Sequence, residues 1–340
     1  AKPPSIHKFP FYLLHLDCFH CEVRNPRYGG YPTHPIEHTI AMLRQIAKPD
    51  RKTRLTLDGG NLSISQVASG DADRVVSITD DPTVLRRVEA SAEVVRRTVR
   101  DGDPIYGVTT GFGGMADQVV PAELAAASQN NLLAFLATGA GKVIDRRHVR
   151  GAMLLRANVL LRGCSGVRLE IVERLTRFLQ SDATPLVREL GSIGASGDLV
   201  PLSTIARAIT GQTGFVRVRI GERIVDGRTA LSELGLEPLE LHPKEGLAIV
   251  NGTSFSSSIA ANAVFETQSL MALAMGAQAM MLRALLAQEG PFDSFIHQSK
   301  PHPGQIWVAR MMTRLLAEGR VASNGKPARI QDRYSIRCLP

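Results

Sequence analysis

The segment from residue 256 to residue 289 constrains the fold of this chain most strongly. It carries no charged residue between Glu266 and Arg283, and it is rich in Ala and Met. About 20 apolar residues suffice to cross a membrane, but bulky aliphatic residues are few here and four polar residues interrupt the run: Thr267, Gln268, Ser269 and Gln278. A helix without a polar face is typical of the inside of a helical bundle or of an interface between subunits. We therefore expect this helix to need more helices around it than the rest of the chain supplies.

The composition favours a mainly helical, globular protein. The chain has 340 residues, which is enough for two domains or for one large core with a satellite. Hydrophobic residues make up 44% and charged residues 21%, a balance that argues against wholesale disorder. Aromatic residues make up only 5%, whereas Ala, Leu and Arg are frequent, and this mixture favours helix over sheet.

The formal net charge of +8 does not indicate a nucleic-acid surface. The arginines are dispersed, and those of one predicted helix fall among apolar positions, as on a solvated face: Arg86, Arg87, Arg96, Arg97 and Arg100. Basic clusters interleaved with aromatic residues are typical of RNA- and DNA-binding proteins, and the sequence shows none. We attribute the charge mostly to solubility, with mild steering of a carboxylate substrate.

The cysteines and the N-terminal segment predict a reduced, cytoplasmic location. Four cysteines are too few for a disulfide framework in a chain of this length: Cys18, Cys21, Cys164 and Cys338. Residues 9–16 are apolar but short, contain Pro10 and His15, and precede no small-residue cleavage site. We therefore expect no signal peptide.

Residues 1–50 differ from the rest of the chain, and we interpret them as an atypical, loosely ordered extension. They hold five of the nine histidines, several prolines, and the pair Cys18 and Cys21. Such a pair beside histidines can bind zinc, but structural zinc sites usually have a second ligand pair at regular spacing, which we do not find. We predict no metal site here or in the regular part of the chain.

From Leu55 onward the pattern is regular and predicts mostly helices. Asp81 followed by Pro82 is a favourable helix start, and apolar residues then follow at helical spacing as far as Gly102, a suitable helix end. Further helices are predicted over 121–137, 145–162 and 168–181, and a small β-hairpin over 215–225. A short strand is suggested by three apolar residues, Leu62, Ile64 and Val67.

Familiar catalytic motifs fail on closer reading. Gly139-Ala-Gly141-Lys142 resembles a phosphate-binding loop, but Val143 stands where Ser or Thr is needed, and Leu136 stands where the first Gly is needed. Neither Ser165 nor Ser196 lies in a Gly-x-Ser-x-Gly elbow.

The segment Gly191-Ser-Ile-Gly-Ala-Ser-Gly-Asp-Leu-Val200 allows two interpretations. The simpler one is a Gly/Ser turn before a helix that starts near Asp198. The chemical one is attack of the Gly197 amide nitrogen on the Ala195 carbonyl carbon, since Gly lacks the Cβ that would obstruct a compressed turn. Loss of water closes a five-membered imidazolone, and dehydration of Ser196 leaves an exocyclic methylene. Such an electrophile would help to remove the weakly acidic β-hydrogen of an aromatic amino acid, because a covalent electron-withdrawing adduct divides one difficult step into easier ones.

Four further blocks accompany GSIGASGDLVPLS (191–203): PIYGVTTGFGG (104–114), LLRANVLLRGCSGVR (154–168), KEGLAIVNGTS (244–254) and QDRYSIRCLP (331–340). In this order they resemble the aromatic amino-acid ammonia-lyase family, that is, the histidine, phenylalanine and tyrosine ammonia-lyases with a methylidene-imidazolone (MIO) group. SKPHPGQ (299–305) looks like the bacterial phenylalanine ammonia-lyases in particular. The resemblance covers roughly Leu55 to Pro340 and is specific in combination.

The resemblance implies a mainly α fold. An MIO-bearing domain with a small β-hairpin is expected over 51–250, and the beginning of a central bundle of long helices over 251–340. The family continues beyond its QDRYSIRCLP block into core helices with an Asn-x-x-x-Asp-Asn-Pro segment and a catalytic-site Glu, so we expect this chain to be the front portion of such an enzyme. Family members are homotetramers whose active sites combine residues of different subunits.

The resemblance also implies roles for individual residues. MIO would form autocatalytically from Ala195-Ser196-Gly197, and Tyr106 would remove the β-proton, for which its usual pKa of about 10 must fall. Arg337 would bind the substrate carboxylate with its two-pronged donor. Asn251 and Tyr334 would support the prosthetic group and the bound amino acid, and Gln331 would help to order that site. Taken singly, each has an ordinary alternative: a core aromatic, a surface arginine or a structural amide.

Substrate choice in the family resembles a two-residue code in the helix after the Tyr106 loop, and this chain has Phe135-Leu136 there. A His at the first position would hydrogen-bond a phenolic hydroxyl, whereas Phe suits an unsubstituted ring, and a buried hydroxyl without a partner is penalised. Leu199 and Leu247 are expected in the same pocket. Phenylalanine is thus favoured over tyrosine, and both over histidine; ordinary core packing of Phe135 and Leu136 is the alternative.

The sequence therefore predicts a carbon–nitrogen lyase that converts L-phenylalanine to trans-cinnamate and ammonia, without metal or nucleotide. Two alternatives remain open. The same machinery fits a phenylalanine or tyrosine 2,3-aminomutase or a tyrosine ammonia-lyase. The chain alone would otherwise be an inactive helical fragment that needs a partner for further helices.

Overall fold

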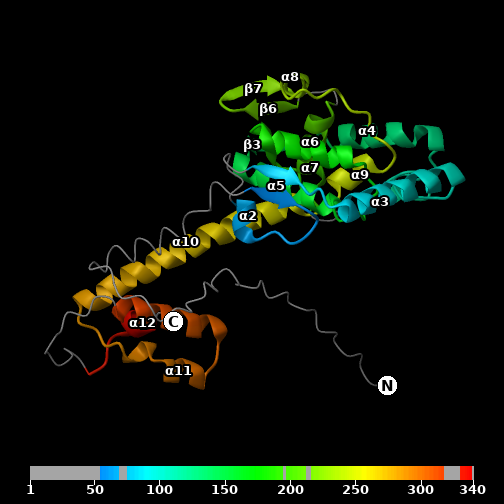
Figure 1. Ribbon diagram of the computed structural model, residues 1–340. Coiled ribbons are helices and arrows are strands. Elements are labelled where there is room, and N and C mark those ends of the chain that lie inside the picture. Colours follow the sequence, from blue (N-terminus) through cyan, green and yellow to red (C-terminus); the bar gives the residue numbers. More distant parts are fainter. Residues whose placement is uncertain (1–53, 69–74, 194–196, 212–215, 318–329, 339–340) are drawn as a thin grey trace, which may run out of the picture.

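One long helix, α10 (Ser254–Ala284), joins two parts of the chain that each have their own core (Figure 1). The computed structural model describes residues 54–68, 75–193, 197–211, 216–317 and 330–338. The larger part consists of the helices and small sheets that precede α10 in the chain. The smaller part consists of α11 (Ser294–Ser299), α12 (Pro303–Ala317) and α13 (Tyr334–Arg337).

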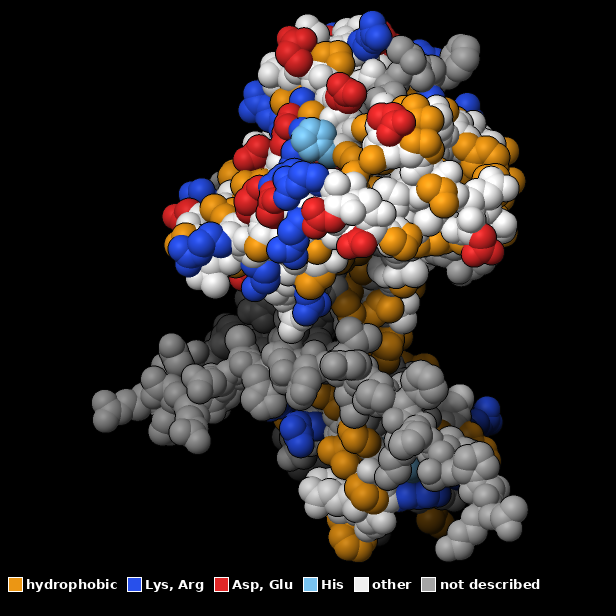
Figure 2. All heavy atoms as spheres, turned by 90° about the vertical axis from the view of Figure 1, so that its right-hand side faces the viewer, with side chains coloured by type: hydrophobic (Ala, Val, Ile, Leu, Met, Phe, Trp, Pro, Cys, Tyr) orange, Lys and Arg blue, Asp and Glu red, His pale blue; other side chains and the backbone are white. Residues whose placement is uncertain are grey.

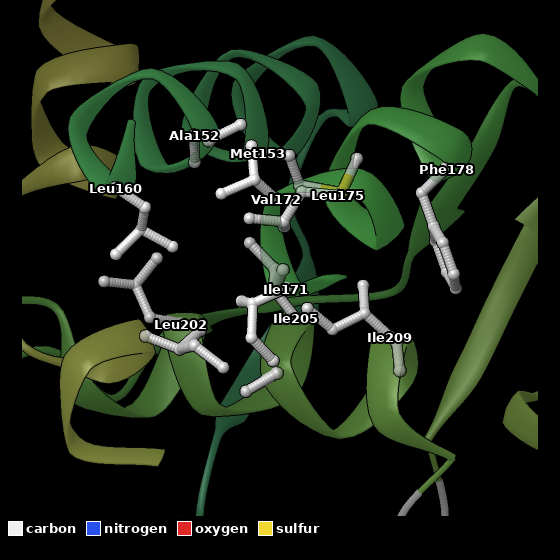
Figure 3. Packing of buried hydrophobic residues seen from close by; sticks show 14 of the residues in the cluster. Ala152, Met153, Leu160, Ile171, Val172, Leu175, Phe178, Leu202, Ile205 and Ile209 are labelled. Atoms are coloured by element: carbon white, nitrogen blue, oxygen red, sulfur yellow. The ribbon is translucent and has the colours of Figure 1, made fainter. Parts of the chain in front are cut away.

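The core of the larger part lies between three helices: α5 (Arg146–Leu160), α6 (Leu169–Gln180) and α7 (Leu199–Thr210). Their apolar faces meet, and Figure 3 shows side chains of all three pointing toward one another, among them Met153, Leu175 and Ile205, all fully buried. Two shorter helices, α4 (Ala125–Phe135) and α9 (Glu245–Val250), pack against α7 and against each other. The helices predicted over 121–137, 145–162 and 168–181 are thus confirmed with narrower bounds, α4 being preceded by the 3-10 turn Ala122–Leu124.

The helix predicted from Asp81 is α3 (Pro82–Asp101). The Asp81 carboxylate accepts a hydrogen bond from the Thr83 amide at 2.8 Å, and Gly102 ends the helix with a φ of 80°, which favours glycine. The arginines on this helix are exposed or half-buried, as expected of a solvated face, while Val84, Val88 and Val95 face the core.

Among the described residues, the strands are short and form three small sheets. β1 (Leu55–Leu57) pairs with β2 (Val76–Ile78) in parallel, and β3 (Ala140–Val143) pairs with β5 (Arg188–Leu190) antiparallel. In the third sheet β4 (Ala183–Pro185) pairs with β6 (Arg217–Ile220), and β6 with β7 (Arg223–Asp226), both antiparallel. The β6–β7 pair is the predicted hairpin. The helix α8 (Gly227–Glu233) follows it.

The strand predicted at Leu62, Ile64 and Val67 is wrong, because this segment contains the helix α2 (Ile64–Ala68). Ser63 and Gln66 exchange hydrogen bonds: the Gln66 amide donates to the Ser63 hydroxyl at 3.2 Å, and the Ser63 amide donates to Gln66 Oε1 at 2.8 Å. This reciprocal pair is a capping box, which starts a helix. Ile64 and Val67, three residues apart, therefore lie on one face of a helix.

The charge-free segment forms α10, as expected. The first turns of α10 pack against α5 and α2, and its last turns pack against α12 through Met275, Ala279 and Leu282. Between these contacts α10 leaves apolar side chains exposed, including Val264, Leu270 and Leu273, and Figure 2 shows hydrophobic side chains on the neck between the two parts. Within the described ranges no helix has the length and apolarity needed to cross a membrane.

Candidate functional site

The end of the predicted precursor tripeptide lies against the segment that follows α9. Gly197 forms a parallel bridge with Gly252, and the Asp198 amide donates to the Gly252 carbonyl at 2.8 Å. Gly197 has a φ of 91°, and a Cβ there would overlap the Gly252 carbonyl oxygen. Only glycine fits this junction. Ala195 and Ser196 lie outside the described residues.

Asp198 fixes the junction through a buried carboxylate. It accepts hydrogen bonds from the Phe255 amide at 2.9 Å, the Ser256 amide at 2.8 Å and the Ser256 hydroxyl at 2.6 Å. These amides belong to the first turn of α10, where an anion is favoured by the helix dipole. The Ser192 hydroxyl also donates to Asp198, at 3.0 Å, so one carboxylate ties both sides of the precursor to α10.

Asn251 is the last residue of the turn that ends α9, and its side chain is exposed next to this junction. Arg156, buried in α5, holds the backbone here: its Nη1 donates to the carbonyl of Asn251 at 3.0 Å and to that of Ala248 at 3.3 Å. Burial lowers the pKa of Arg156 to about 10, and the Asp198 carboxylate acts in the opposite direction. The guanidinium remains charged at neutral pH.

Tyr106 lies on a loop that is folded on itself. The loop is closed by the bridge between Thr110 and Val119 and by the Ile105 amide, which donates to the Thr109 hydroxyl at 2.8 Å. The Tyr106 hydroxyl accepts a hydrogen bond from the Gly113 amide at 3.0 Å. The side chain is 52% exposed, so Tyr106 is not a packed core aromatic in this chain.

The four apolar residues expected to choose the substrate differ in exposure. Phe135, at the end of α4, is 79% exposed, whereas Leu136 is buried and packs into the core. Leu199 begins α7 and Leu247 lies in α9; both are half-buried against the same core. Leu247 also approaches the Tyr106 loop, because a Cβ on Gly107 would lie 2.9 Å from Leu247 Cδ2.

The other three predicted site residues lie in the smaller part of the molecule. The Gln278 side chain, in α10, donates hydrogen bonds to the carbonyls of Ser335 and Ile336 in α13. Gln278 lies 24 residues after Ser254, the first residue of α10, which is about 36 Å along a helix. The Arg337 guanidinium lies 4.3 Å from the centre of the Tyr334 ring, and its Nε donates to the Asp332 carbonyl. Tyr334 and Gln331 are exposed. One chain therefore does not bring these residues to Gly197.

Sequence reasoning missed three buried polar residues around the junction: Gln129, Arg156 and Asp198. Arg156 and Asp198 lie inside the quoted blocks, but nothing in their spacing shows what they bind, because most of their partners lie far along the chain. A pocket of about 180 Å³ lies elsewhere, between α3 and the Arg168–Glu245 ion pair, and no candidate site residue lines it. In the part of the chain that the structure describes, no group of three or more His, Cys, Asp or Glu could hold a metal ion.

Comparison with known proteins identifies the family. The aromatic amino acid lyase family model matches residues 62–340. The chain is 47% identical over 295 residues to a phenylalanine ammonia-lyase of Nostoc punctiforme, which covers 84% of this chain and 52% of that protein. The structure is similar to phenylalanine ammonia-lyase from Rhodosporidium toruloides, with a TM-score of 0.72 and 32% identity, covering 88% of this chain and 44% of that one. It is also similar to the phenylalanine aminomutase of Pantoea agglomerans, with a TM-score of 0.73 and 31% identity, covering 84% of this chain and 58% of that one.

The chain thus spans about half the length of the curated relatives that it matches. The mainly helical fold with one small hairpin agrees with the fold of the solved relatives. On the match over residues 62–340, this chain belongs to the aromatic amino acid lyase family.

Proposed function

We propose that the protein, in its full-length form, eliminates ammonia from L-phenylalanine to give trans-cinnamate. The observation that carries the proposal is the junction at Gly197. A glycine-only backbone conformation directly after Ala195 and Ser196 is pressed against Gly252 and tied down by Asp198. The identity of 47% to a phenylalanine ammonia-lyase supports the same substrate.

The residues around this junction fit an MIO group derived from Ala195-Ser196-Gly197. Gly197 lacks the Cβ that would collide with Gly252, and cyclisation needs this freedom. When formed, the group supplies an electrophilic methylene that withdraws electrons from the bound amino acid. The exposure of Asn251 beside the junction supports its proposed role, which is to hydrogen-bond the group or the substrate.

Tyr106 acts as the base in this proposal. Its oxygen takes the β-proton of the substrate while the ammonia leaves from the α-carbon. The Gly113 amide donates a hydrogen bond to that oxygen and so holds it in place on the loop. The exposure of the ring leaves room for a substrate to approach.

The apolar residues favour an unsubstituted ring. Phe135, Leu136, Leu199 and Leu247 offer no hydrogen bond to a phenolic hydroxyl or an imidazole, so tyrosine and histidine would lose a solvation that the site does not replace. We propose phenylalanine as the preferred substrate on this basis.

We further propose that Gln331, Tyr334 and Arg337 reach the site from another subunit of a homotetramer. In one chain, α10 keeps them far from Gly197. The exposure of Gln331 and Tyr334 and the exposed apolar side chains of α10 support an assembly of copies. In it the Arg337 guanidinium binds the substrate carboxylate. The cytoplasmic location and the domain bounds 1–50, 51–250 and 251–340 stay predictions.

The test is incubation of the purified full-length protein with L-phenylalanine, followed by cinnamate absorbance and by intact mass. We expect absorbance to rise and the mass to fall by two waters relative to the translated sequence. Ser196→Ala is expected to abolish the mass loss and the activity together. Unchanged absorbance in protein that has lost both waters would refute the assignment.

An aminomutase is the second candidate, favoured by the similarity to the Pantoea agglomerans phenylalanine aminomutase. It would use the same residues and return ammonia to the β-carbon. Chiral chromatography of the products separates the two, because a β-amino acid appears only if the ammonia is added back.

A further inference from the structure

We propose that Gln129 is a positioning residue that holds the Tyr106 loop against α9, and thus places the catalytic base relative to the substrate pocket. The proposal rests on the proposed function for the role of Tyr106. Its structural part, the clamp itself, stands on contacts of this chain alone.

Gln129 makes two hydrogen bonds to segments far along the chain from each other. Its Nε2 donates to the Gly107 carbonyl at 3.0 Å, and its Oε1 accepts from the Leu247 amide at 3.0 Å. Because a carbonyl can only accept and a backbone amide can only donate, these partners fix which way the side-chain amide points. The residue is fully buried, so bulk water does not compete for either hydrogen bond.

Both partners lie close to residues of the proposed reaction. Gly107 directly follows Tyr106, so a bond to its carbonyl holds the loop one residue after the proposed base. Leu247 lies in the first turn of α9, where the side chain of the N-cap residue Lys244 does not cap the helix and instead donates to the Ser165 carbonyl. Gln129 therefore satisfies an amide that the helix leaves free, and α9 carries Leu247 at one end and Asn251 at the other.

The packing around Gln129 leaves little room for an alternative arrangement. A Cβ on Gly246 would lie 2.9 Å from the Gln129 carbonyl oxygen, so α9 approaches α4 backbone to backbone. On the other side, a Cβ on Gly107 would lie 2.7 Å from the Phe112 ring. A Cβ on Gly107 would also lie 2.9 Å from Leu247 Cδ2, so the loop and α9 touch beside the Gln129 side chain, and both glycines permit the close approach.

Two substitutions test the clamp. Gln129→Met keeps the length of the side chain and removes both hydrogen bonds. Gln129→Glu keeps both bonds only while its carboxyl is protonated, because an ionised carboxylate cannot donate to the Gly107 carbonyl. Burial raises the pKa of a carboxyl, so this variant is expected to hold the loop at low pH and to release it as pH rises.

The control is Gln180→Met. The Gln180 Nε2 also donates to a backbone carbonyl of a distant segment, that of Val76 in β2, at 2.7 Å, but Gln180 is exposed at the end of α6. This variant reports what the loss of such a bond does to stability alone. It is expected to leave kcat, KM and loop dynamics unchanged.

The measurements are made on the full-length protein, with intact mass to confirm loss of both waters. Gln129→Met is expected to lower kcat by roughly 10- to 100-fold with a smaller change in KM, because a misplaced base affects the chemical step more than substrate binding. Gln129→Glu is expected to add a descending limb to the pH profile of kcat that neither the parent nor Gln180→Met shows. A kcat for Gln129→Met equal to that of the parent overturns the role in placing Tyr106.

Hydrogen–deuterium exchange of peptides covering residues 104–120 and 244–251 tests the clamp independently of activity. Gln129→Met is expected to speed exchange in both segments, and Gln180→Met in neither. Unchanged exchange overturns the clamp even if kcat falls. Should the parent prove inactive with every aromatic amino acid, the proposed function fails, while faster exchange would still establish the structural clamp.

Discussion

At the scale of single residues, the site depends on contacts that tolerate little change. The backbones of Gly197 and Asp198 lie against that of Gly252, and the Arg156 guanidinium donates a hydrogen bond to the Asn251 carbonyl. These are not packing preferences but steric and hydrogen-bonding requirements. If these contacts are lost, we therefore expect formation of the proposed prosthetic group to fail before the fold does.

Gly197→Ala tests this requirement. The added Cβ would overlap the Gly252 carbonyl oxygen, and the φ of 91° is unfavourable for alanine. We expect the variant to fold but to keep the mass of its unmodified residues, with activity at background. Intact mass and circular dichroism measure the two effects separately. A Gly197→Ala protein that loses both waters and retains activity would contradict the junction described above. The control is Gly221→Ala in the β6–β7 turn, which also has a positive φ but no atom near its added Cβ.

A second residue-scale prediction concerns pH and the buried Glu245. Burial alone would raise the pKa of Glu245, but hydrogen bonds from Arg168 and from the His242 amide outweigh it and hold the pKa below its usual 4.5. A carboxyl with a lowered folded-state pKa stabilises the protein above its unfolded-state pKa, and this stability is lost as pH falls through the folded-state pKa.

Glu245→Gln should therefore be less stable than the parent at neutral pH, by an amount near the lower end of the roughly 3–5 kcal/mol typical of a broken buried pair. The difference between the two proteins should shrink below about pH 4. Urea unfolding at several pH values measures it. A difference that stays constant from neutral to acid pH would show that the charge of Glu245 is not what stabilises the pair.

At the scale of elements, the start of α3 depends on a capping residue that the sequence alone predicts, Asp81. Asp81→Ala removes the side-chain oxygen that accepts from the Thr83 amide, and α3 should lose about 1 kcal/mol of stability. Thermal unfolding measures this loss. Asp81→Asn, which keeps an acceptor oxygen, should restore most of it, and equal losses in both variants would argue against capping.

The sequence could predict those elements whose signals lie within a few residues, namely the cap at Asp81, the stop at Gly102 and the hairpin of β6 and β7. It failed at α2, where a five-residue helix is started by Ser63 and Gln66 rather than by an apolar stripe. It named Gly197 and Tyr106 as site residues through family blocks. It did not find Gln129, because its partners Gly107 and Leu247 lie 22 and 118 residues away, and no periodicity reports contacts of such separation.

At the scale of the whole molecule, the geometry divides the candidate site residues into two sets. Tyr106, Gly197 and Asn251 lie in the larger part, and Gln331, Tyr334 and Arg337 lie beyond most of the length of α10. Bending a helix of this length to join the sets within one chain would break its backbone hydrogen bonds. Joining them between copies needs only that exposed surfaces meet, and the exposed apolar residues of α10 provide such surfaces.

This arrangement predicts complementation between two inactive variants. Tyr106→Phe removes the proposed base from one set, and Arg337→Ala removes the proposed carboxylate-binding group from the other. Because each proposed site takes the two residues from different copies, co-expression should create some sites with both native residues, and activity should return to a fraction of that of the parent. The same proteins purified separately should stay near background, as should a chain that carries both substitutions when expressed alone. If the two residues instead met within one chain, every mixed assembly would contain only defective sites. Ammonia-lyase rates of co-expressed and separately purified proteins, with assembly size measured by light scattering, distinguish the two arrangements: a co-expressed tetramer without recovered activity would exclude a site shared between subunits.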